Sequence, residues 1–159
     1  MEKKILVTGG AGYIGSVLVK RLLGKGYHVS VFDSLFFGEK PIKDLLKNPK
    51  FELVKGDIRN LGEFPDILKN IYAVIHLASL SNDPSCDLDP KDTMDINYNS
   101  SVRLEELCKK NKIKRFLFSS SCSVYGASQD FILDETSEKA PVSLYAKSKI
   151  DFENKLLEM

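Results

Sequence analysis

The feature that most constrains the fold is an apolar run that leads directly into a glycine-rich turn and then into a helical pattern. Ile5–Val7 is a short, uninterrupted apolar run, which is typical of a parallel strand buried on both faces. The turn, Thr8–Gly15, carries four glycines. Apolar residues at helical spacing follow it: Ile14, Val17, Leu18, Leu22 and Leu23. The first 25 residues or so therefore predict a buried strand, a tight turn and an amphipathic helix.

Strand and helix patterns continue to alternate along the chain. Four further apolar runs predict strands at 29–33, 51–54, 73–77 and 115–118. Helical patterns cover a short stretch around Leu45, then 61–69, 93–111 and 144 to the end. The segments 34–41, 79–92 and 119–141 are rich in turn-forming residues and are predicted to be loops. We therefore predict one α/β domain of 159 residues, with a Rossmann-like, doubly wound parallel sheet of about five strands in three layers.

The glycine turn predicts a phosphate site. Gly10, Gly12 and Gly15 satisfy G-x-G-x-x-G, and Gly9, Gly12 and Gly15 satisfy G-x-x-G-x-x-G. In both patterns the glycines let the backbone approach a pyrophosphate, whose charge meets the helix N-terminus. Asp33 ends the second strand about 20 residues later, where a carboxylate can accept hydrogen bonds from adenosine ribose hydroxyls. This carboxylate would repel a 2′-phosphate, which favours NAD over NADP. The alternative is a glycine turn with an exposed Asp of no function.

Asp57 and Ile58 follow the third strand. A carboxylate at that position can meet the amino group of adenine. The alternative is that Asp57 caps a helix or closes a turn.

Tyr145 and Lys149 are four residues apart on the last predicted helix, so they share one face of it. Lysine is frequent in this chain, so the same spacing also arises by chance. The stronger evidence is that the Tyr/Lys motif follows the fifth strand, where ligands bind in open α/β sheets. The pKa of tyrosine is normally about 10, and a nearby ammonium together with a positive nicotinamide ring favours the phenolate. Tyr145 is thus a candidate general base.

Ser119–Gly126 follows the fifth strand and supplies a candidate hydroxyl. Ser121 could hydrogen-bond a reacting oxygen, while Ser119 and Ser120 are expected to support the loop. The alternative is a serine-rich turn that satisfies backbone groups.

Taken together, these motifs resemble the extended short-chain dehydrogenases/reductases, and within them the NAD-dependent epimerase/dehydratase family with its nucleotide-sugar epimerases. The matching positions are Thr8–Gly15, Asp33, Asp57–Ile58, His76–Ser79, Asn97, Ser119–Gly126 and Tyr145–Lys149. The resemblance implies catalysis by Ser121, Tyr145 and Lys149, and substrate contacts from Ser81, Ser121 and Tyr145. It implies that these residues bind the cofactor: Gly9, Gly12, Tyr13, Ile14, Gly15, Asp33, Ser34, Asp57, Ile58, Leu77, Ala78, Ser79, Asn97, Ser119, Tyr145 and Lys149.

The activity implied is NAD-dependent epimerisation of a nucleotide-activated sugar by transient hydride transfer at a sugar carbon, with Tyr145 as the base. Family dehydratases carry an Asp-Glu pair after the hydroxyl residue, whereas this chain has Cys122 and Ser123, which argues against dehydration. The alternatives are a nucleotide-sugar reductase or decarboxylase of the same family, or a non-catalytic NAD-binding fragment. Family members continue past the Tyr/Lys helix, so we expect this chain to correspond to their N-terminal part, without the C-terminal substrate domain.

Net charge and cysteine content limit the classes of partner expected for the protein. A net charge of +1 gives no global field to attract nucleic acid or an anionic membrane. Three dispersed cysteines and no C-x-x-C pair suggest neither a metal site nor a disulfide framework, and fit a cytoplasmic protein. Family relatives commonly dimerise, so we expect a homodimer through the long helix and the Tyr/Lys helix.

Overall fold

The computed structural model describes residues 3–81, 83–127 and 132–158. Its contacts divide the chain into two compact units. The first unit contains Met1–Ala78 and Arg103–Ser119, and the second contains Ser79–Val102 and Ser120–Met159. The expectation of a single domain stays a prediction, and each unit is described by itself below.

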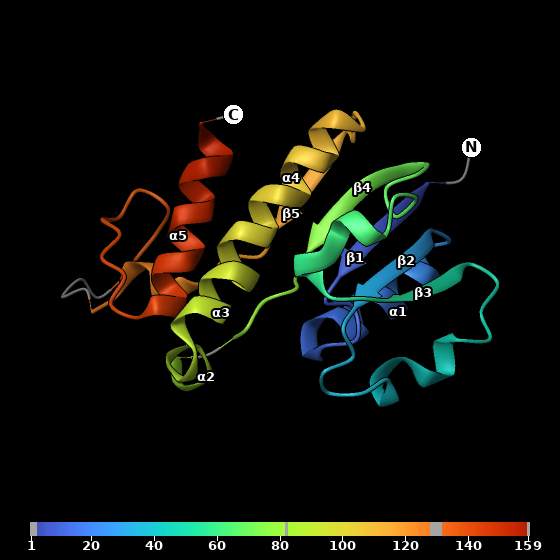
Figure 1. The fold of residues 1–159 in the computed structure, drawn as a ribbon, viewed down its shortest axis with the longest axis horizontal. Coiled ribbons are helices and arrows are strands. Elements are labelled where there is room, and N and C mark those ends of the chain that lie inside the picture. The colour runs from blue at the N-terminus through green and yellow to red at the C-terminus, as the bar shows by residue number, and fades with distance from the viewer. Residues whose placement is uncertain (1–2, 82, 128–131, 159) are drawn as a thin grey trace. The chain divides into compact units, whose positions relative to one another are not determined.

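The first unit is built on a parallel sheet of five strands in the order β3-β2-β1-β4-β5 (Figure 1). The strands are β1 (Lys4–Thr8), β2 (His28–Asp33), β3 (Phe51–Lys55), β4 (Ile71–His76) and β5 (Arg115–Phe118). β1 is central, with Leu6 paired to Ser30 on one side and to Val74 on the other. This order and the parallel pairing confirm the predicted Rossmann-like sheet.

The core of the first unit explains why the strand patterns could be found in the sequence. Ile5, Leu6 and Val7 are all buried, because β1 is covered on both faces and each side chain enters an apolar layer. Val29 and Val31 of β2 pack in the same cluster as Ile5 and Val7. Burial of such side chains contributes about 1.5–3 kcal/mol each, which is how a run of apolar residues specifies this sheet.

The first unit contains the α-helix α1 and two shorter 3₁₀-helices. α1 (Tyr13–Gly24) packs against β1 and β2, and Gly26 follows it in a left-handed conformation, with φ +86°. η1 (Lys40–Leu45) and η2 (Ile58–Glu63) are 3₁₀-helices. The predicted helix at 61–69 is wrong in part, since η2 covers only its first residues and the segment after η2 consists largely of turns up to β4. Pro65 explains the error, because its ring and its missing N–H disfavour a helix interior.

The second unit is helical. It contains α2 (Asp83–Leu88), α3 (Pro90–Met94), the π-helical segment η3 (Asp95–Asn99), η4 (Cys122–Tyr125) and α5 (Leu144–Leu157). The helix α4 (Ser100–Lys110) begins in this unit and continues into the first. The predicted loop at 79–92 is therefore wrong in part, because it holds α2 and the start of α3. Asp89 explains the second helix start, since its carboxylate caps α3 by accepting from Asp92 N at 2.9 Å.

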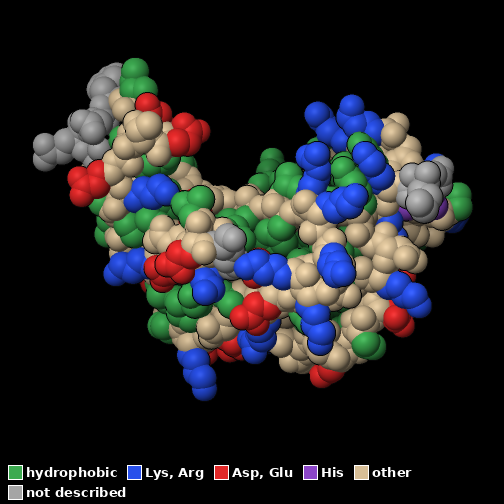
Figure 2. Space-filling view, turned by 90° about the horizontal axis from the view of Figure 1, so that it is seen from above, with side chains coloured by type: hydrophobic (Ala, Val, Ile, Leu, Met, Phe, Trp, Pro, Cys, Tyr) green, Lys and Arg blue, Asp and Glu red, His purple; other side chains and the backbone are tan. Residues whose placement is uncertain are grey.

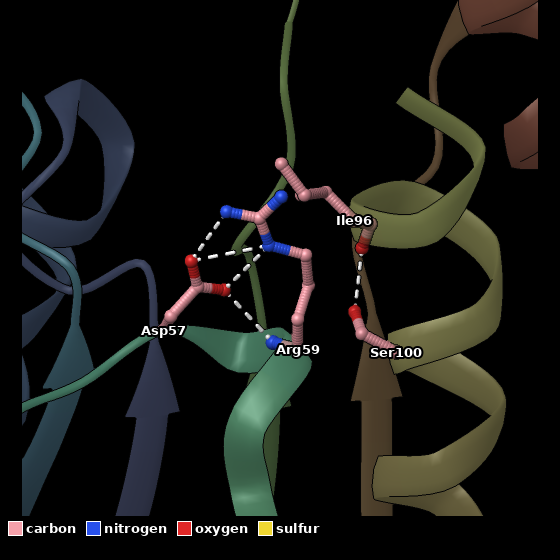
Figure 3. A network of polar contacts seen from close by, with 4 residues as sticks. All are labelled: Asp57, Arg59, Ile96 and Ser100. Atoms are coloured by element: carbon pink, nitrogen blue, oxygen red, sulfur yellow. Dashed lines mark hydrogen bonds and ion pairs between the residues drawn. The ribbon is translucent and has the colours of Figure 1, made fainter. Parts of the chain in front are cut away.

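The long helix predicted at 93–111 is present from Pro90 to Lys110, but its middle is π-helical. Two serines follow the π segment and bond back to it. Ser100 Oγ donates to Ile96 O at 2.6 Å (Figure 3), and Ser101 Oγ donates to Asn97 O at 2.7 Å. These hydroxyls supply partners to carbonyls in the stretch where the helical ladder changes register.

Acidic and basic side chains both occur on the face drawn in Figure 2, in keeping with the net charge of +1. Within the part of the chain that the structure describes, no helix has the length and apolar character needed to cross a membrane. Among those same residues, no three or more His, Cys, Asp or Glu side chains are grouped so that they could hold a metal ion.

Candidate active site

The predicted cofactor residues of the first unit follow the carboxyl ends of its strands. Parallel strands bring these ends to one edge of the sheet, where ligands bind in open α/β folds. The residues concerned are Gly9, Gly12, Tyr13, Ile14 and Gly15 after β1, Asp33 and Ser34 at the end of β2, Asp57 and Ile58 after β3, Leu77 and Ala78 after β4, and Ser119 after β5. The sheet order thus gathers twelve of the predicted positions along one edge.

Two glycines of the turn are required by close backbone approaches. Gly9 has φ +71°, and a Cβ there would lie 2.7 Å from Ala78 N, in the segment after β4. A Cβ on Gly15 would lie 2.3 Å from Gly9 O. Both contacts are closer than real Cβ atoms come, so these positions need glycine for the turn to close.

The N-terminus of α1 can receive an anion. Gly12 is its N-cap and offers no side chain to the amides of the first turn. Tyr13 is 93% exposed and Ile14 is exposed as well, so the helix begins at the surface. The helix dipole and the uncapped N–H groups suit a pyrophosphate.

Asp33 links the glycine turn to the segment after β2. Its Oδ2 accepts from Ala11 N at 2.9 Å, and its Oδ1 accepts from Leu35 N at 2.8 Å. Each carboxylate oxygen can accept a further hydrogen bond. The Asp33 side chain therefore stabilises the turn and still has acceptor capacity for ribose hydroxyls. The neighbouring predicted cofactor residue, Ser34, is exposed.

Asp57 is engaged by Arg59 (Figure 3). Asp57 Oδ1 accepts from Arg59 N at 2.9 Å, and the Arg59 guanidinium donates to both carboxylate oxygens at 2.7–3.1 Å. Hydrogen bonding by Arg59 holds the pKa of the Asp57 carboxyl below its usual value. The carboxylate thus caps η2, which is the alternative role considered above, and its contact with adenine stays a prediction. Ile58 beside it is buried.

A buried polar pair fixes the segment after β4. Thr8 Oγ1 and His76 Nδ1 lie 2.6 Å apart, and Ala78 N donates to Thr8 Oγ1 at 3.3 Å. Leu77 N donates to Thr8 O at 3.1 Å, and Ser119 N donates to His76 O at 3.3 Å. The backbone at three of the predicted cofactor positions is therefore held by β1 and β4.

The predicted catalytic residues all belong to the second unit, as do Ser79, Ser81 and Asn97. Tyr145 and Lys149 lie on α5, whose N-cap Ser143 accepts from Ala146 N at 3.2 Å. Lys149 Nζ lies 5.5 Å from the centre of the Tyr145 ring. The i, i+4 spacing therefore places the two side chains together, as predicted from the sequence.

Burial lowers the pKa of Lys149 to about 8. Lys149 is 4% exposed, so its ammonium form loses most of its hydration. At neutral pH most of the Lys149 side chains still carry a proton.

Burial also raises the pKa of Tyr145, and a hydrogen bond with Ser121 works against that rise. From the sequence, the neighbouring ammonium was expected to favour the phenolate, whereas in the protein alone desolvation is the larger influence on the pKa of Tyr145. Tyr145 is therefore a neutral phenol at physiological pH until further positive charge comes close to it.

Ser121 is the N-cap of η4. It accepts from Ser123 N at 3.3 Å and from Ser123 Oγ at 2.8 Å. η4 packs against α5, the helix that carries Tyr145. In the sequence, Ser123 stood out only as a difference from the dehydratases. The missed signal was a second hydroxyl two residues after Ser121.

Asn97 is 1% exposed and uses its whole side chain within the second unit. Its Nδ2 donates to Leu80 O at 3.0 Å and to Ser148 Oγ at 3.3 Å, and its Oδ1 accepts from Leu80 N at 2.8 Å and Ser79 Oγ at 3.1 Å. All four hydrogen-bonding positions of the amide are filled. Asn97 thus joins the segment after β4 to α5, and its direct contact with a cofactor stays a prediction.

Ser148 is a residue that the sequence argument missed. It is fully buried, and its Oγ donates to Tyr145 O at 2.7 Å while accepting from Asn97. Its place next to Lys149 in the Tyr/Lys motif was the available signal. Ser81, the predicted substrate contact, is exposed.

Comparison with known proteins identifies one family. The model of the NAD dependent epimerase/dehydratase family matches residues 5–159. A UDP-glucose 4-epimerase of Lacticaseibacillus casei is 34% identical over 151 residues, which cover 94% of this chain and 44% of that protein. A UDP-glucose 4-epimerase of Klebsiella pneumoniae is 36% identical over 128 residues, which cover 77% of this chain and 92% of that protein.

Solved structures similar to this chain come from epimerases as well. The UDP-Glc/GlcNAc 4-epimerase from Campylobacter jejuni is similar with a TM-score of 0.92 and 29% identity, over 98% of this chain and 48% of that chain. UDP-glucose 4-epimerase from Brucella ovis, solved in complex with NAD, is similar with a TM-score of 0.88 and 28% identity, over 98% of this chain and 47% of that chain. This chain therefore spans about half the length of most of these relatives.

Proposed function

Because the chain belongs to the NAD dependent epimerase/dehydratase family, we propose that it binds NAD and serves the epimerisation of a nucleotide-activated sugar. The relatives named above are UDP-sugar epimerases, which supports a nucleotide sugar as the substrate class. A transient oxidation at one sugar carbon, followed by reduction from the opposite face, is the chemistry that this proposal requires.

One observation carries the proposal: a single compact unit brings Ser121, Tyr145 and Lys149 together. Ser121 caps η4, which packs against α5, the helix that carries Tyr145, and Lys149 Nζ lies 5.5 Å from the Tyr145 ring. A protein that only bound the dinucleotide would have no need for this arrangement of a buried phenol, a hydroxyl and a buried cation.

The residues at the sheet edge fit NAD. The exposed N-terminus of α1 with its glycine N-cap suits the pyrophosphate, and the remaining acceptor capacity of Asp33 suits the adenosine ribose. Lys149 would hold the nicotinamide ribose, as the family resemblance implies. When bound, NAD supplies the acceptor and donor of hydride for the sugar carbon.

The residues of the second unit would manage the proton. Tyr145 removes the proton of the sugar hydroxyl as general base and returns it when the keto group is reduced. Ser121 donates a hydrogen bond to the reacting oxygen and holds it near Tyr145. The positive nicotinamide ring and Lys149 would lower the pKa of Tyr145, which burial alone raises.

Released nucleotide tests cofactor binding directly. We expect denaturation of the purified chain to release close to one NAD(H) per chain, measured by chromatography and absorbance. The NAD-loaded protein should then interconvert epimers among UDP-, GDP- or dTDP-sugars with no net change in NADH absorbance. Net consumption or release of NADH would support the reductase or decarboxylase instead. Bound NAD without turnover of any nucleotide sugar would support the non-catalytic module, and absence of NAD binding would contradict the proposal.

We also propose a homodimer that uses the long helix and the Tyr/Lys helix, and a cytoplasmic location. The location is supported by three cysteines without disulfide partners, of which Cys86 and Cys108 are buried. Light scattering of the purified chain should give twice the mass of 17.8 kDa. A monomer mass across the accessible concentration range would contradict the dimer.

A further inference from the structure

We propose that Arg59 is a positioning residue for the adenine end of the cofactor, and that it acts by fixing the direction in which the Asp57 carboxylate accepts a hydrogen bond. Arg59 has this role only if the sheet edge binds NAD, so the inference rests on the proposed function. It deepens that function by assigning base selectivity to a side chain outside the predicted cofactor residues.

Arg59 contacts Asp57 through its backbone N–H and two N–H groups of its guanidinium (Figure 3). The backbone N lies 2.9 Å from Oδ1, Nε lies 3.1 Å from both Oδ1 and Oδ2, and Nη2 lies 2.7 Å from Oδ2. The direction of each hydrogen bond is fixed, because these groups of arginine can only donate and an ionised carboxylate can only accept. The backbone contact alone would cap η2. The guanidinium contacts are additional to that cap.

The guanidinium contacts restrict rotation of the Asp57 carboxylate. The terminal torsion of an aspartate is broad, so a carboxylate held at one oxygen can still turn. The donors of a guanidinium form a rigid planar fork, and a fork that contacts both oxygens fixes the plane of the carboxylate. The side chains of Arg59 and Asp57 are 32% and 33% exposed, so a ligand can reach the oriented group.

Asp57 keeps acceptor capacity for a ligand. An ionised carboxylate has about four acceptor positions, and the contacts with Arg59 use three N–H groups. Asp57 follows β3 at the same edge of the sheet as Gly12 after β1 and Asp33 at the end of β2. The pyrophosphate and the adenosine ribose are proposed to bind at those two positions, so the base lies within the same edge. Because Arg59 fixes the carboxylate, a donor on the base must approach from one direction.

Adenine and hypoxanthine differ in the group that such a carboxylate can distinguish. Adenine carries an amino group at C6, which donates hydrogen bonds, whereas hypoxanthine carries an oxygen there, which only accepts. A site built to pair with a donor rejects an analogue that lacks it. A carboxylate that can rotate would turn away from the hypoxanthine oxygen and discriminate less. We therefore expect Arg59 to increase the preference of the protein for adenine over hypoxanthine.

A second ion pair in the same unit provides a matched control. Lys4 Nζ lies 2.7 Å from Glu52 Oε2, the same length as the shortest contact between Arg59 and Asp57. Lys4 is the first residue of β1 and Glu52 is the second residue of β3, so this pair lies toward the amino ends of the strands. Ligands bind at the carboxyl ends. Lys4→Met therefore removes a comparable ion pair without affecting the proposed adenine site.

Competition between two dinucleotides tests the role of Arg59 without any sugar or turnover. Each protein is equilibrated with equal, saturating concentrations of NAD and nicotinamide hypoxanthine dinucleotide, separated from unbound nucleotide and denatured, and the released dinucleotides are quantified by chromatography. The same ratio should be reached from protein first loaded with either dinucleotide. We expect wild type to retain NAD in roughly tenfold excess, the low end for a hydrogen bond to a charged group at a partly exposed site. This ratio is measured on bound protein, so a change in the folded fraction does not alter it.

Arg59→Met should lower the excess of NAD to roughly twofold, because the carboxylate is then held only by the backbone contact. Arg59→Lys should lower it as well, since an ammonium is a point charge without the planar fork, and this variant serves if Arg59→Met does not fold. Asp57→Ala should lower the ratio at least as far, and Lys4→Met should leave it at the wild-type value.

The possible failures of the two proposals are distinguishable. A wild-type ratio in Arg59→Met or in Arg59→Lys would overturn the role of Arg59 while NAD binding stands. Equal retention of the two dinucleotides by wild type would do the same, because Asp57 would then not read the base. Retention of neither dinucleotide by wild type would contradict the proposed binding of NAD, and the role of Arg59 would fall with it.

Discussion

Replacing Tyr145 by phenylalanine is expected to lower kcat for epimerisation by roughly 10²–10⁴-fold while NAD binding is retained. The substitution removes one hydroxyl and keeps the ring that packs beside Lys149. The loss is large because Tyr145 is the proposed general base, and Ser121 alone, with a hydroxyl of much higher pKa, cannot accept the sugar proton. The measurement is a progress curve for interconversion of the two sugar epimers, together with the NAD(H) content of each preparation.

A matched variant distinguishes the loss of the proposed general base from the loss of a tyrosine hydroxyl elsewhere in the same unit. Tyr98 belongs to the same unit and lines a small surface groove with Asp151 and Asn154. Tyr98→Phe should therefore keep the wild-type rate. Equal rates for wild type and Tyr145→Phe, at equal NAD(H) content, would remove Tyr145 from the mechanism.

The sheet could be predicted from the sequence because its strands are buried on both faces. A fully covered strand such as Ile5–Val7 must be apolar at successive positions, and this leaves a run that needs no tertiary information to find. Order and register were not contained in that pattern. The sequence predicted only a doubly wound parallel sheet, and the order β3-β2-β1-β4-β5 comes from the structure.

The short helices could not be predicted in the same way. α2 and α3 have only six and five residues, too few to show a helical period, and Asp and Pro residues there also favour turns. The π segment is set by long-range contacts, since Asn97 is fixed by Leu80 and Ser148 from other parts of the chain. Sequence spacing does not encode such contacts.

The candidate site was predictable where spacing alone decides proximity. Tyr145 and Lys149 come together because one helix turn separates them. The hydrogen bonds of Ser123 and Ser148 depend on side-chain placement, which the sequence does not show. The direction of the Tyr145 pKa shift could not be predicted from the sequence either, because the burial of Tyr145 depends on how α2 and η4 pack against α5.

The second large expected effect concerns Lys149 and changes the free energy of unfolding rather than the reaction rate. Its pKa is about 8 in the folded chain, against 10.5 for an exposed lysine. The unfolded chain therefore binds more protons than the folded chain between these values, so the free energy of unfolding rises with pH across this window. The ammonium form is disfavoured in the fold below pH 8, and the penalty disappears above pH 10.5. Lowering the pKa from 10.5 to about 8 corresponds to about 3 kcal/mol.

Comparison with Lys149→Met isolates this contribution, because methionine fills similar space and does not titrate. Between pH 7 and pH 10.5 the stability of wild type relative to Lys149→Met should increase by about 3 kcal/mol, measured by urea unfolding at each pH. Lys147→Met, at an exposed position on the same helix, should show no such pH dependence relative to wild type. A flat difference for Lys149→Met would mean that Lys149 is hydrated in solution and its pKa is not lowered. The expected rise would mean that the fold tolerates a buried cation at a cost in stability, which is the trade expected where a charge is retained for binding and catalysis.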